Sequence, residues 1–89
     1  MEATVQELRR LIVRAAPDPG RARPVETCPD DQPLDAVIPF SSVIVLGVVV
    51  AIEDRWGLRV TKAMLARALE GGATLQKLAA LVETAGGGG

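Results

Sequence analysis

The chain has 89 residues with ten basic and eleven acidic side chains, a formal charge of −1, one cysteine and no histidine. This length provides one small domain, and the balanced charge excludes the broad positive potential that a phosphate-backbone binder needs, so nucleic acid is not an expected partner. The absence of histidine removes the commonest general base and its pairings with Ser or Cys nucleophiles, so the chain is not expected to be an enzyme.

The first predicted element is an amphipathic helix over residues 4–16. Thr4 and Glu7 have the spacing of a capping box, and apolar residues then recur at helical intervals on one face. Three arginines fall largely off that face and are interpreted as its solvated side. The apolar positions are Val5, Leu8, Ile12 and Ala15, and the arginines are Arg9, Arg10 and Arg14.

Residues 17–40 are predicted to form a long irregular loop, because all six prolines of the chain lie there among charged residues. So long a loop is either functional or a sign that the assignment is wrong. Cys28 lies within it, with no second cysteine for a disulfide and no ligand set for a metal. We interpret it as an exposed thiol without a role, in a protein of the reducing cytoplasm.

The run from Val43 to Ile52 is rich in β-branched residues and has the local propensity of a strand. Its continuation to Trp56, with Gly57 as a C-cap, has the length of a helix, so a helix is predicted over 42–56. The uncharged run is too short to span a bilayer. One apolar face is predicted from Val43, Leu46, Val49, Val50, Ile52 and Trp56, which leaves Ile44, Val45 and Val48 pointing elsewhere.

Two further helices are predicted over 61–69 and 74–84, each beginning at a threonine that can cap it. Gly71 and Gly72 separate them, and residues 86–89 are expected to be a flexible glycine tail. The fold class is therefore all-α, with four helices in one domain over residues 1–85. The inward positions are expected to be Met64, Leu65 and Ala68 in the first of these two helices, and Leu75, Leu78, Ala79, Leu81 and Val82 in the second.

The segment Ile38-Pro-Phe-Ser-Ser-Val43, together with Ala51-Ile-Glu-Asp-Arg-Trp-Gly57, resembles the acyl carrier proteins of fatty-acid and polyketide synthesis. That family has a serine at the start of the second of four helices, and an acidic turn, an aromatic residue and a glycine at its end. The register selects Ser42 and leaves Ser41 as the cap. The resemblance covers most of the chain and implies a four-helix bundle with a long loop between its first two helices and a short third helix.

The resemblance implies that Ser42 carries 4′-phosphopantetheine, transferred from coenzyme A by a phosphopantetheinyl transferase. The thiol of that arm would hold an acyl or polyketide intermediate as a thioester and present it to enzymes such as a ketosynthase or an acyltransferase. A helix N-terminus favours a phosphodiester at this position, because its free N–H groups and dipole stabilise negative charge.

The sequence departs from the family where the serine is usually preceded by Asp, since Ser41 stands there. The acidic face that the family shows to its enzymes is also missing. We expect instead a hydrophobic contact with a dedicated partner in a specialised pathway, although the same apolar helix can also pair with itself in a homodimer. The residues predicted to face a partner are Ser41, Val43, Ile44, Gly47, Val48 and Met64.

Three other interpretations stay open. Without the family register, the two serines are a plain helix cap. The terminal glycines are also found in sulfur carriers and ubiquitin-like modifiers, but those proteins need a sheet, and this chain offers a single strand-like run. Finally, the loss of the Asp and of the acidic face is compatible with a carrier fold that is never modified and acts as a binding or scaffolding subunit.

Overall fold

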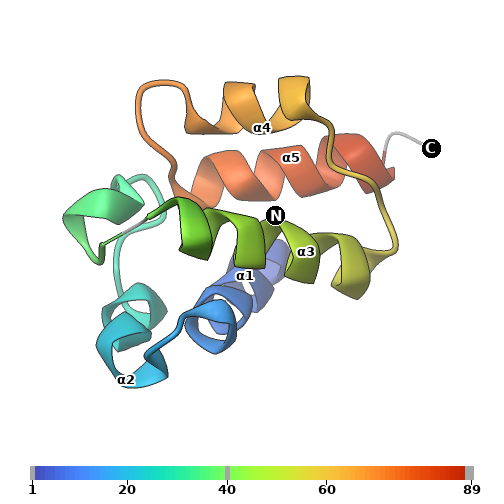
Figure 1. Ribbon diagram of the computed structural model, residues 1–89. Helices are drawn as coiled ribbons and strands as arrows, with labels where there is room; N and C mark the ends of the chain where they lie inside the picture. Colours follow the sequence, from blue (N-terminus) through green and yellow to red (C-terminus); the bar gives the residue numbers. More distant parts are fainter. Residues whose placement is uncertain (1, 40, 88–89) are drawn as a thin grey trace.

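The computed structural model describes residues 2–39 and 41–87, and these residues form helices and loops without a strand (Figure 1). The absence of a strand disfavours the sulfur-carrier interpretation. The elements in chain order are α1 (Glu2–Ala15), α2 (Pro19–Ala22), the 3₁₀ turns Arg23–Glu26 and Leu34–Ala36, α3 (Ser42–Trp56), α4 (Lys62–Leu69) and α5 (Leu75–Gly87).

The predicted all-α class is confirmed, and the four predicted helices correspond to α1, α3, α4 and α5 within two or three residues at each end. The short helix α2 is additional, because Asp18 caps it by accepting the Arg21 N–H and Pro19 has the backbone angle a first turn needs. The expected glycine tail is wrong for Gly86 and Gly87, which continue α5. Phe40 and residues 88–89 lie outside the described residues.

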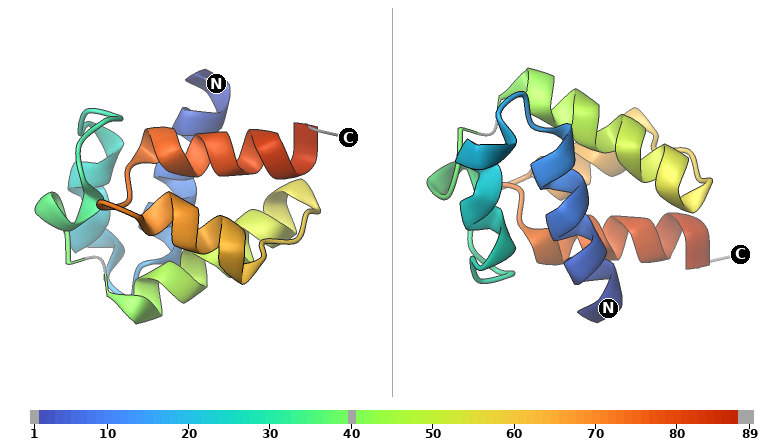
Figure 2. Two further views of the ribbon diagram at one scale, coloured as in Figure 1. Left: turned by 90° about the horizontal axis from the view of Figure 1, so that it is seen from above. Right: turned by 90° about the horizontal axis from the view of Figure 1, so that it is seen from below.

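The core lies where α1 crosses α3 and α5, and Figure 2 shows α1 running steeply across both. The α5 prediction is confirmed at all five positions, since Leu75, Leu78, Ala79, Leu81 and Val82 are buried. In α1 the buried set is Val5, Leu8, Leu11 and Ile12. Helix α4 packs beside α5 and buries Ala68, whereas Met64 and Leu65 are only half-buried.

Helix α3 has the bounds predicted from the length of the apolar run, but the residues that it buries differ from those predicted. Gly57 ends it in a left-handed conformation with φ of +62°, as a C-cap glycine does. Its buried residues are Ile44, Val48 and Ile52, spaced four apart. Its exposed large hydrophobic residues are Val43, Leu46 and Val50, at 68%, 63% and 63%. The apolar face was therefore assigned to the exposed side for three of its six residues, because nearly every position of this helix is apolar.

The loop between α1 and α3 is packed against the core. Val25 and Leu34 are fully buried, and Ile38 is 5% exposed. The Leu34 N–H donates to the Ala73 carbonyl at 2.8 Å, and the Gln76 N–H donates to the Asp30 carbonyl at 2.9 Å. These two bonds fasten the loop to the start of α5, so the segment that leads into α3 has a fixed position.

Candidate functional site

The two serines at the start of α3 have different structural roles. Ser41 has an extended backbone and its Oγ accepts the Ile44 N–H at 3.5 Å, while its carbonyl accepts the Val45 N–H at 2.9 Å. Ser41 is thus the N-cap, as predicted. Ser42 is the first helical residue and is exposed. Its hydroxyl is not needed to cap the helix and is available to react.

An open depression of about 480 Å³ lies beside Ser42, between α3 and the turn that joins α4 to α5. Leu46 and Leu69 contribute to its apolar wall, and Asp35 is the one charged residue among those that line it. The full lining is Asp35, Ser42, Val45, Leu46, Leu69, Gly72 and Ala73. A group attached to Ser42 would therefore leave the helix beside an apolar surface that offers no cation.

The described residues do not pair the Ser42 hydroxyl with a base. No described residue forms a hydrogen bond with the Ser42 hydroxyl, and the sequence has no histidine. A serine hydroxyl is a weak nucleophile unless a neighbouring base takes its proton. The arrangement can receive a group from an external enzyme, which would have to supply that base.

The residues expected to face a partner do not form one surface. Ser41 and Val43 are exposed beside Ser42. Ile44 and Val48 are 9% and 2% exposed, so the prediction that they face a partner is wrong. They lie in the core because α1 and α5 pack against that side of α3.

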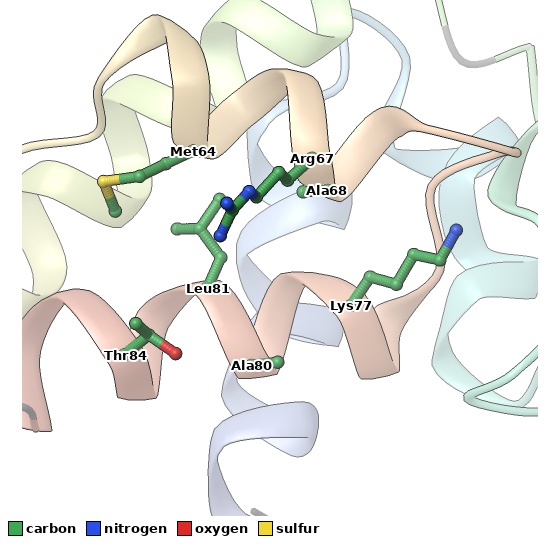
Figure 3. Close-up of a pocket in the computed structure, with 7 residues that line it drawn as sticks. All are labelled: Met64, Arg67, Ala68, Lys77, Ala80, Leu81 and Thr84. Atoms are coloured by element: carbon green, nitrogen blue, oxygen red, sulfur yellow. The ribbon is translucent and has the colours of Figure 1, made fainter.

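Gly47 and Met64 also have other neighbours than expected. A Cβ on Gly47 would lie 3.5 Å from the Ala15 carbonyl oxygen, so the backbone that approaches Gly47 belongs to α1 of the same chain. Met64 is half-buried and lines a hollow of about 280 Å³ between α4 and α5 (Figure 3). That hollow shares no lining residue with the depression beside Ser42.

Two basic side chains, Arg67 and Lys77, line the hollow between α4 and α5 and have different contacts. Figure 3 shows the Arg67 side chain extending across it toward Leu81. Lys77 instead reaches the connecting turn, where its amino group donates to the Glu70 and Gly72 carbonyls. Lys77 thereby satisfies carbonyls at the end of α4, a capping role that the sequence analysis did not predict.

Arg9 and Cys28 were both misjudged from the sequence. The Arg9 Nη1 donates to the Val25 carbonyl at 2.9 Å and to the Cys28 carbonyl at 2.7 Å, so Arg9 ties α1 to the loop. Cys28 is 8% exposed and belongs to the core. Arg9 follows Val5 by four residues and precedes Ile12 by three, and this spacing beside the buried stripe was the available signal.

Two general features of the described residues bear on function. They contain no cluster of three or more His, Cys, Asp or Glu side chains placed to hold a metal ion. None of their helices has the length and apolar character required to cross a bilayer.

Comparison of the chain with protein-family models, with curated proteins and with solved structures found no significant match.

Proposed function

We propose that this chain is a carrier protein and that Ser42 receives 4′-phosphopantetheine from coenzyme A through a separate transferase. The observation that carries the proposal is that the two serines at the start of α3 have different structural roles. Ser41 caps the helix, and Ser42 presents an exposed hydroxyl from the first helical position. A plain cap would require only the first of these serines.

The electrostatics of this position support a phosphodiester. The first turn of a helix has N–H groups without intrahelical partners and the positive end of the helix dipole, and α3 has no acidic residue in its first turn to occupy them. A phosphodiester oxygen on Ser42 would lie beside these donors. The stabilisation is typically about 0.3–1 kcal/mol for an exposed site.

The carried group would be an acyl or polyketide intermediate, held as a thioester on the thiol of the arm. The tether raises the effective concentration of the intermediate at the active site of each enzyme that docks, such as an acyltransferase or a ketosynthase. We assign the chemistry to those enzymes, since no described residue forms a hydrogen bond with the Ser42 hydroxyl. We place this carrier in a specialised pathway of the cytoplasm, because α3, which corresponds to the second helix of the family, lacks the acidic surface of common acyl carriers.

A second candidate is an unmodified carrier fold that acts as a binding or scaffolding subunit. Two observations favour it: Ser41 stands where the carrier family has an Asp, and Asp35 is the one charge lining the depression beside Ser42. An acidic group near the site would repel the phosphate of the arm.

Intact mass measurement separates the two candidates. The protein is incubated with coenzyme A and a broad-specificity phosphopantetheinyl transferase, and with a transferase from the same source as the chain. We expect the mass of one phosphopantetheine to be added to the wild type and to Ser41→Ala, and no addition to Ser42→Ala.

Far-UV circular dichroism controls for folding, because Ser41→Ala removes a cap worth about 1 kcal/mol. Thr61→Ala removes the cap of α4 in the same way, through the Met64 N–H, and serves as the matched variant away from the site. If the wild-type protein gains no mass with either transferase, the carrier function is excluded and the unmodified scaffolding subunit remains as the candidate.

A further inference from the structure

The exposed side of α3 is the most apolar helix face that the described residues leave uncovered. Val43, Leu46 and Val50 are its large side chains. With Gly47 and Asp54 they fall at intervals of three and four residues, which places all five on one stripe of the helix. In the right-hand view of Figure 2, α3 lies along an outer edge of the molecule, so another helix can approach it.

From this face we propose that two copies of the chain associate symmetrically, with their α3 helices antiparallel. This inference is independent of the function proposed for Ser42. A two-fold interface requires a surface that is complementary to itself. The stripe meets that requirement when the axis passes beside Leu46 and Gly47.

The antiparallel register can be worked out residue by residue. Val43 of one copy lies opposite Val50 of the other, which pairs two exposed valines twice. At the centre, the two Leu46 side chains meet each other. The two Gly47 residues lie beside them, each within the groove between α1 and α3 of its own copy, where the missing Cβ faces Ala15.

The charges agree with the same register. Asp54 is exposed, and no ion pair to it is found among the described residues. In this register Asp54 lies opposite Pro39 of the second copy, three residues before the first residue of its α3, and so faces the N-terminal end of that helix. A carboxylate is stabilised there by the positive end of the helix dipole. A parallel pairing would instead bring the two Asp54 carboxylates together.

A groove beside α3 provides room for the second helix. It is an open depression of about 530 Å³ between α1 and α3, and its lining is mostly apolar. The lining residues are Leu11, Arg14, Ala15, Leu46, Gly47, Val50, Ala51 and Asp54. Standard interfaces bury about 800 Å² from each partner, so a contact one helix long is small and a dissociation constant on the order of 100 µM is expected.

The first test is sedimentation equilibrium of the wild-type chain from about 5 to about 500 µM. We expect the mass to rise from 9.3 kDa toward twice that value. Leu46→Glu places two carboxylates at the axis and should weaken association at least about tenfold. Ala66→Glu makes the same kind of change at an exposed position of α4 and should leave association unchanged.

The second test fixes the register by disulfide formation. In Leu46→Cys the two new thiols meet near the axis, and an oxidant should cross-link the copies. In Val50→Cys the two thiols are about 10 Å apart along the helices, beyond the reach of a disulfide. Wild-type protein controls for Cys28, which is buried.

A mass of 9.3 kDa at every concentration would overturn the proposal and leave the face to a different protein. Cross-linking of Val50→Cys as fast as Leu46→Cys would overturn the antiparallel register.

Discussion

The orientation of α3 can be tested by making the same substitution at two positions of the helix. Val48 is 2% exposed and Val50 is 63% exposed, although only two residues separate them. Val48→Ala and Val50→Ala each remove two methyl groups and each replace a β-branched residue by the best helix former. The difference between the two variants therefore reports burial alone.

The expected magnitudes follow from these exposures. At Val48 the lost transfer energy is about 1.6 kcal/mol, at about 0.8 kcal/mol for each buried carbon, and the cavity left behind adds about 1 kcal/mol. The gain in helix propensity returns about 0.6 kcal/mol, so the net loss of unfolding free energy is about 2 kcal/mol. At Val50 about a third of the transfer energy is lost, no cavity forms, and the propensity gain cancels the loss.

Urea unfolding followed by far-UV circular dichroism measures both variants, at about 5 µM protein so that association makes no contribution. Val48→Ala should also lower the Tm by roughly 10 °C, and Val50→Ala should leave it nearly unchanged. Equal losses at the two positions, or a larger loss at Val50, would show that the faces of α3 have been assigned wrongly.

Three further predictions concern residues that have other neighbours than the sequence led us to expect. Gly47→Ala should raise the unfolding free energy by about 1 kcal/mol in urea titrations, because the new methyl group would meet the Ala15 carbonyl oxygen at an ordinary contact distance of 3.5 Å. Arg9→Met should lower it by about 2 kcal/mol, since the Val25 and Cys28 carbonyls lose a charged donor; an effect below about 0.5 kcal/mol would contradict this role. The Cys28 thiol should react with a thiol reagent far more slowly in the native protein than in urea, because it is buried, and equal rates would contradict its place in the core.

The helix boundaries could be predicted because their signals are local. Ser41 and Thr61 cap through an N–H three residues away, and Gly57 adopts the left-handed conformation that glycine tolerates best. The inward face of α5 could be predicted for a similar reason. Polar residues such as Gln76 and Thr84 mark its exposed side, so the pattern has a direction.

The faces of α3 could not be predicted, because valine, isoleucine and leucine occupy both sides and hydrophobicity favours neither. Which side of α3 is buried depends on α1 and α5, which pack on it and are far away in sequence. The surroundings of Ser42 depend on equally distant contacts. The Leu34 N–H donates a hydrogen bond to the carbonyl of Ala73, and no local sequence pattern predicts that bond. The choice of Ser42 rests on the family register and stays a prediction, whereas the depression beside it had no signal in the sequence.

The apolar residues on the outer side of α3 are not required by the core. Ile44, Val48 and Ile52 already supply the stripe that α3 contributes to it. Charged residues such as Glu or Lys would form the helix better than valine and would keep the surface hydrated. The exposed valines and leucine are therefore the reason for the proposal that a second copy covers this face.

Two proposals compete for that face. They share the first turn of α3, where Val43 would be covered in either complex, but the two contacts have different centres. An enzyme that acts on Ser42 must cover the first turn of α3, whereas pairing of two copies centres on Leu46 and Gly47, more than one turn further along. Leu46→Glu should weaken pairing at least about tenfold. If the same variant still gains phosphopantetheine at the wild-type rate, the middle of α3 serves pairing alone. If it loses both properties, the transferase covers the same stripe, and association of two copies would then withhold Ser42 from modification.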